Sequence, residues 1–156
     1  MNHFPPRRIE LLAVVMLLFW SLPAQSRQLD FDYFKNEVQP IFLAKRPGNV
    51  RCIQCHTRSS NFRLQPLEEG RLFWTDAQSR QNYESALQFV QPGADPLQSR
   101  FLTHPLGSAA GGDAFHGGGT HFHSQFDPEW RIMADWVAGA TERRTPSATT
   151  VRIIQT

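Results

Sequence analysis

The sequence contains little cysteine, methionine and lysine. Its 156 residues include two cysteines, three methionines and only two lysines, Lys35 and Lys45. Two cysteines exclude the set of disulfides that stabilises many small exported domains. The arginines are scattered and the formal net charge is only +2, which argues against the basic stripe of a nucleic-acid-binding protein. The longest apolar run, Leu11 to Trp20, is shorter than the roughly 20 residues that a membrane-spanning helix needs.

The first 26 residues have the layout of an export signal. Arg7 and Arg8 precede the apolar run, and small residues with Pro23 follow it. This order is typical of a secretory signal peptide. We therefore expect residues 1–26 to be a signal peptide, cleaved after Ala24 or Ser26, and the mature protein to be exported. The alternative is an uncleaved N-terminal anchor.

The remainder is long enough for one domain of modest size. We expect this domain over residues 27–140, followed by a polar tail over 141–156. Without Arg7, Arg8 and Glu10 the formal charge falls from +2 to +1. We expect no nucleic acid as partner, because such binding requires concentrated positive charge.

Four helical segments are expected, and strand signals are weak throughout. The first spans 29–43, where Pro40 should kink or divide it. The second begins with the capping-box pattern Thr75-Asp-Ala-Gln78, and Pro92-Gly93 stops it. A short helix runs from Asp95-Pro96 to about His104, and the last begins at Asp127-Pro128 and ends near Gly139. A glycine-rich loop over 107–124 separates these two. The expected fold class is therefore all-α.

The two cysteines form the motif that bears chemistry, Cys52-Ile-Gln-Cys-His56. Two thiols on one helical turn can add to the two vinyl groups of a porphyrin, and the next residue, a histidine, can then coordinate the iron. We expect Cys52 and Cys55 to attach one haem c covalently and His56 to be its proximal ligand. Export supports this, because haem c is attached outside the cytoplasm.

Three other readings of the motif compete with haem. A thioredoxin-like redox pair would follow a strand, and none is expected before Cys52. A zinc site would need His121 and His123, which lie far downstream. A local disulfide between Cys52 and Cys55 would close too small a loop to stabilise the fold much.

The second axial ligand of the iron is expected to be a histidine. Met1 and Met16 belong to the export signal, and Met133 lies on the apolar face of the last helix, where a role in the core is favoured. His116 is the first candidate, because the glycines after it let the backbone approach a porphyrin. His104, His121 and His123 are the alternatives. An extended segment would point His121 and His123 the same way, although loop histidines are often simply solvated.

The chain resembles the small exported monohaem cytochromes c of the planctomycete type. The shared segments are Phe34 to Ile41, the haem motif, Val90 to Ser99, His116 to Gly119, and Pro128-Glu-Trp130 with Trp136. The resemblance implies a class I-like cytochrome c fold with long loops around the haem, its first and last helices packed together. It also favours His116, because the distal ligand of such domains comes from this loop. Many relatives have methionine there, and this chain does not.

These observations predict an electron carrier rather than a catalyst. The protein would transfer single electrons between redox partner proteins, in the periplasm or at the outer face of the cytoplasmic membrane. Arg51, Arg58 and Arg63 flank the motif and can contact the haem propionates or a partner. Membrane association would require an uncleaved N-terminal segment or a membrane complex. The alternative is a haem enzyme or a sensor of small ligands, with an open or displaceable sixth iron ligand.

Overall fold

The computed structural model describes residues 28–46, 50–58, 60–91 and 95–142. The expected signal peptide, loop residues 47–49, the helix stop at Pro92-Gly93 and the tail from residue 143 lie outside these ranges. The described part is mainly helical, which confirms the all-α class. Its only strand-like pairing is one isolated bridge between Leu106 and Phe122. No helix among the described residues is long and apolar enough to cross a membrane.

The first helical segment is one continuous run with three local geometries. It comprises the α-helical turn α2 (Phe31–Tyr33), the π-helical turn η1 (Phe34–Val38) and the 3₁₀ turn η2 (Gln39–Leu43). The side chain of Asp30 caps it by accepting a hydrogen bond from the Tyr33 amide, at 2.6 Å. Pro40 has no N–H to donate to the preceding turn, and the geometry changes at Gln39, directly before it. The run therefore changes its helical geometry at Pro40, as expected of a proline there, but it is not interrupted.

The second segment, α4 (Asp76–Leu87), begins as its sequence predicts. The Thr75 hydroxyl accepts from the Gln78 amide at 3.3 Å, and the Gln78 side chain accepts from the Thr75 amide at 3.0 Å. These reciprocal bonds satisfy donors that a helix start leaves unpaired. Tyr83 and Ala86 are buried and lie on its inner face.

The expected single helix from Asp95 to His104 is instead two short turns. They are η4 (Pro96–Gln98) and α5 (Arg100–Thr103), and the backbone of Ser99 between them is extended. Ser99 is fully buried, and its hydroxyl accepts a hydrogen bond from the Gln91 amide at 2.9 Å. This bond connects Ser99 to Gln91, eight positions earlier. A local sequence pattern does not predict such a contact.

The last helix, α6 (Pro128–Val137), follows its sequence signals. The Asp127 carboxylate accepts from the Glu129 amide at 3.0 Å, and Gly139 terminates the helix with a φ of 91°, a conformation that favours glycine. Four residues of the predicted apolar face are buried: Trp130, Met133, Trp136 and Val137.

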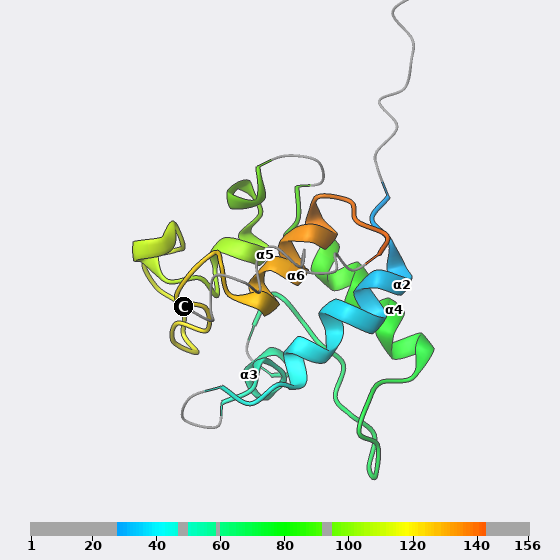
Figure 1. Cartoon of the computed structure of the whole chain (residues 1–156). Coiled ribbons are helices and arrows are strands. Elements are labelled where there is room, and N and C mark those ends of the chain that lie inside the picture. The colour runs from blue at the N-terminus through cyan, green and yellow to red at the C-terminus, as the bar shows by residue number, and fades with distance from the viewer. Residues whose placement is uncertain (1–27, 47–49, 59, 92–94, 143–156) are drawn as a thin grey trace, which may run out of the picture.

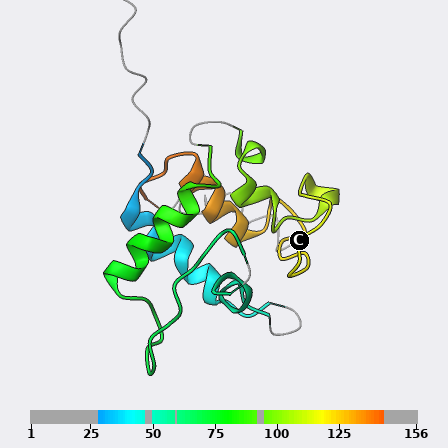
Figure 2. The same ribbon diagram turned by 180° about the vertical axis from the view of Figure 1, so that it is seen from behind.

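The first and last segments pack together around Trp136. Its indole N–H donates to the Asp30 carbonyl at 2.8 Å, and its ring centre lies 5.0 Å from that of Phe34. The hydroxyl of Tyr83, from α4, donates to the Leu29 carbonyl at 2.6 Å. Figure 1 and Figure 2 show α2, α4 and α6 gathered side by side, with the turn that carries the cysteine motif at one end of this group.

Candidate haem site

The cysteine motif forms a single helical turn, α3 (Cys52–His56). The Arg51 amide donates to the Gln54 side chain at 2.8 Å and holds the start of the turn. The His56 carbonyl accepts from the Leu64 amide at 2.9 Å, which fixes its end. Cys52, Cys55 and His56 all line one cavity of about 440 Å³. This volume lies in the range of roughly 300–1,000 Å³ that cofactor and ligand sites occupy.

The walls of this cavity are largely aromatic. The rings of Phe42, Phe62 and Phe101 contact one another, with centres 5.6 to 6.2 Å apart. Further apolar lining comes from Ile41, Phe89, Phe122 and Met133. Such a lining suits a flat apolar ligand, because it removes apolar surface from water on both partners.

Both thiols are free among the described residues. Burial raises the pKa of Cys52 to about 11, so this residue is a thiol at neutral pH, whereas Cys55 is exposed. No strand precedes the motif within residues 28–46 and 50–51, which agrees with the argument against a thioredoxin-like site. No group of three or more His, Cys, Asp or Glu side chains in the described ranges can hold a metal ion. A Cys₂His₂ zinc site with His121 and His123 is therefore not formed there.

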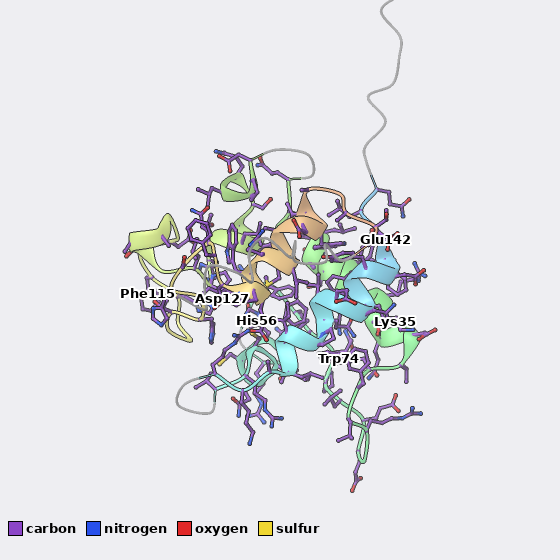
Figure 3. The ribbon with its side chains drawn as sticks, in the orientation of Figure 1. Lys35, His56, Trp74, Phe115, Asp127 and Glu142 are labelled. Atoms are coloured by element: carbon purple, nitrogen blue, oxygen red, sulfur yellow. The ribbon has the colours of Figure 1, made fainter. Side chains whose placement is uncertain are left out.

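His56 is oriented by the backbone. Its Nδ1 lies 2.8 Å from the Phe62 carbonyl oxygen, and a carbonyl can only accept, so Nδ1 carries the proton. The neutral ring then has its lone pair on Nε2, the nitrogen that a metal requires. Burial lowers the pKa of His56, and the hydrogen bond to Phe62 opposes this only in part. His56 is half-buried, and its label lies near the centre of the view in Figure 3.

His116 reaches the same cavity from the glycine-rich loop. Its ring centre lies 6.3 Å from that of His56, and the two ring planes differ by 24°. The Nδ1 atom of His116 lies 2.7 Å from the Gly119 carbonyl oxygen, so it also presents an unprotonated Nε2 when neutral. The side chain of the preceding residue, Phe115, is 79% exposed and stands at the periphery in Figure 3. The loop therefore turns His116 inward and Phe115 outward.

The spacing of these two rings matches two ligands of one iron. A metal–imidazole bond is about 2 Å long, and the ring centre lies about 1 Å beyond the nitrogen, so two axial rings stand roughly 6 Å apart. Cys52 and Cys55 are on the turn that carries His56. Cys52, Cys55, His56 and His116 are therefore the residues that would hold a haem in this cavity.

His104 also lines the cavity, next to His116. Their ring centres are 4.7 Å apart. The Nδ1 atom of His104 lies 2.7 Å from Asp113 Oδ2, and Arg100 lies 3.6 Å from the same oxygen. Burial would raise the pKa of Asp113, but hydrogen bonds from His104 and Thr103 and the charge of Arg100 lower it overall. Sequence reasoning missed Asp113, because nothing in Gly-Gly-Asp marks a hydrogen bond with a residue nine positions earlier.

His121 and His123 do not point the same way. The chain bends at both residues, so the extended segment on which parallel side chains depended is not formed. His121 is only 8% exposed, lines the cavity and lies 5.0 Å from His116 between ring centres. Burial, assisted by His116 and Arg46, lowers the pKa of His121 to about 4. His123 is exposed and lies outside the cavity.

Met133 has two roles in the structure. It is buried in the core, at 3% exposure, as its helical position predicts. It also borders the cavity, because α6 passes along one wall. The thioether therefore belongs to the apolar lining, where a flexible sulfur side chain fills irregular space.

The three flanking arginines stay outside the cavity. Arg63 donates to the carbonyls of Thr57 and Arg58, at 3.0 and 2.5 Å, and so braces the chain after α3. The arginine that does line the cavity is Arg100. Arg46 lies behind the cavity wall, with its guanidinium 4.7 Å from the Phe122 ring centre and paired with Glu129. Arg100 is far from the motif in sequence, so proximity along the chain did not identify it.

Comparisons with known proteins give no further assignment, since no family model, curated protein or solved structure matches this chain. The functional argument rests on the residues and their arrangement.

Proposed function

We propose that this protein is a c-type cytochrome with one covalent haem and that it transfers single electrons outside the cytoplasm. Cys52 and Cys55 would form the thioethers, His56 would be the proximal ligand and His116 the distal ligand. The observation that carries the proposal is the convergence of both thiols, His56 and His116 on one cavity, with the two rings 6.3 Å apart. A bound haem would supply one-electron chemistry at its iron.

The protein's own residues would set the properties of that iron. The carbonyls of Phe62 and Gly119 accept the Nδ1 protons of His56 and His116. Each bond holds the ring orientation and makes the opposite nitrogen a stronger donor. The aromatic lining would reduce the contact of a bound haem with water. Ligation by two histidines should give a lower reduction potential than ligation by histidine and methionine.

We infer a class I-like cytochrome c fold for the domain over 27–140. Two features support it. The first and last helical segments contact each other through Trp136, Phe34 and Asp30, and the cysteine turn α3 lies against η2 at the end of this pair. The glycine-rich loop then supplies the distal side of the site, as in the resembling cytochromes.

We also propose that the protein works in the periplasm or at the outer face of the cytoplasmic membrane. The order of basic, apolar and small residues over 1–26 supports export. Covalent attachment of haem needs the same compartment. Its partners would be redox proteins that approach the haem edge.

The alternative, a haem enzyme or ligand sensor, is favoured by one observation. His104 and His121 lie beside His116 in the cavity, where either imidazole can exchange a proton with a small molecule that replaces His116. The two proposals differ in how firmly the sixth ligand of the haem iron would be bound.

The optical spectrum of the protein, purified from a periplasm with haem-attachment machinery, separates these proposals. A carrier should show low-spin bands that persist when carbon monoxide is added to the reduced form. High-spin bands, or rapid binding of carbon monoxide, would favour the enzyme or sensor. Protein that folds without haem would contradict both.

A further inference from the structure

His121 is the one cavity histidine whose ring nitrogens have no partner. His56, His104 and His116 each use Nδ1 in a hydrogen bond. No such bond involves the ring of His121 within the described residues, although this residue is more than nine-tenths buried. His121 lines the cavity, and a ring nitrogen without a protein partner there is free to bind a group that enters it.

His121 lies directly beside the distal ligand. Its ring centre is 5.0 Å from that of His116, and both rings approach Gly118. A Cβ atom at Gly118 would lie 3.2 Å from His116 Cε1 and 3.2 Å from His121 Nε2. The absence of a side chain at residue 118 therefore lets both rings occupy the same side of the cavity.

The backbones that carry the two rings are held differently. The amides of His121 and Phe122 both donate to the Pro105 carbonyl, at 3.0 and 3.1 Å, and Phe122 forms the bridge to Leu106. His116 lies in a turn closed by the bond from the Gly119 amide to its own carbonyl, at 2.8 Å, and three glycines follow it. The His121 backbone is thus anchored to the rest of the fold, and the His116 turn depends mainly on its own bonds.

His104 is less suited to exchange with His116. Its ring is fixed by Asp113 at 2.7 Å, and Pro105 follows it directly. The bond to Asp113 holds the His104 ring in its present place, whereas the His121 ring has no such bond.

We propose that His121 is a reserve axial ligand, which binds the haem iron when His116 leaves it. The site would then exchange one histidine for another at the distal position and remain low-spin while the glycine-rich loop moves. This inference rests on the proposed function, since it requires a haem. It adds a second distal ligand and a conformational exchange to that function.

The test compares four variants by the optical and electron paramagnetic resonance spectra of purified, haem-loaded protein. His116→Ala should stay largely low-spin, because His121 takes the vacated position. His121→Ala should stay low-spin, because His116 still binds the iron. The double variant His116→Ala/His121→Ala should be high-spin and should bind carbon monoxide readily when reduced. His116→Ala/His123→Ala is the matched control, because His123 is exposed and outside the cavity, and it should behave as His116→Ala.

Three results would overturn the proposal. A high-spin His116→Ala variant would show that no reserve ligand exists. A low-spin double variant would assign the role to another residue, such as His104 or Met133. A high-spin His121→Ala variant would make His121 the resident ligand. If the double alanine variant does not fold, His116→Ala/His121→Gln provides the same comparison, since glutamine keeps an uncharged polar side chain. Absence of covalent haem from the wild-type protein would instead refute the proposed function.

Discussion

The rings of His56 and His116 lie 6.3 Å apart across one cavity, although 60 positions separate them in the sequence. His56 is placed by the cysteine turn and the Phe62 carbonyl, and His116 by its own glycine turn. The sequence alone identifies the cysteine motif, but it leaves open which histidine of the loop lies opposite His56.

Gly112 is expected to be indispensable for the loop that carries His116. A Cβ atom at this position would lie 1.9 Å from the Leu106 carbonyl oxygen and 2.8 Å from that of Thr103. These are backbone atoms and cannot move aside cheaply, so Gly112→Ala should lower the free energy of unfolding by about 3 kcal/mol. Thermal or denaturant unfolding measures this. Gly117→Ala is the control, because a Cβ atom there meets nothing within 4 Å, and an equal loss in both variants would refute the argument.

Trp136 should be the main contributor to the contact between the first and last helical segments. Trp136→Phe removes the hydrogen bond to the Asp30 carbonyl and part of a fully buried side chain. We expect a loss of about 2 kcal/mol in the free energy of unfolding, measured by denaturant titration. Phe126→Ala, at a side chain that is 84% exposed, should change stability very little. A Trp136→Phe variant as stable as the wild type would contradict the packing described.

The ion pair between Lys35 and Asp76 should make a small, pH-dependent contribution to stability. Lys35 Nζ lies 2.5 Å from Asp76 Oδ1, and the hydrogen bond and charge of Lys35 lower the pKa of Asp76. A carboxyl whose pKa is lower in the folded than in the unfolded state stabilises the fold above its ordinary pKa, and this contribution disappears as pH falls through the folded pKa. Asp76→Asn and Lys35→Met should therefore melt slightly below the wild type at pH 7.

The melting temperatures of both variants should approach that of the wild type in acid, once Asp76 is protonated. Thermal scans from pH 7 down to about pH 2 check this, because that range passes below the ordinary aspartate pKa of about 3.9. A difference that stays constant over the whole range would assign the effect to packing instead of charge.

The helix starts could be predicted because their determinants are local. Asp30, Thr75 and Asp127 each cap the residues that directly follow them, so a short window of sequence contains the whole interaction. The cysteine motif is local in the same sense, and α3 forms as a single turn around it.

The distal side of the site depends on long-range contacts instead. His121 is buried because its amide and that of Phe122 bond to Pro105, which folds the end of the loop back onto its beginning. The pairing of His104 with Asp113 arises from the same fold. The interruption at Ser99 follows from its bond to Gln91. None of these partners lies within one helical turn of the residue concerned, so periodicity and capping rules carry no information about them.

The mass of the denatured mature protein tests covalent haem attachment most directly. Wild-type protein from a periplasm with haem-attachment machinery should exceed the mass of its polypeptide by one haem, and its band on a denaturing gel should stain for haem. Cys52→Ala/Cys55→Ala should lose both signals, and His123→Ala should keep them. A wild-type chain without added mass, or a double cysteine variant that still stains, would contradict the account.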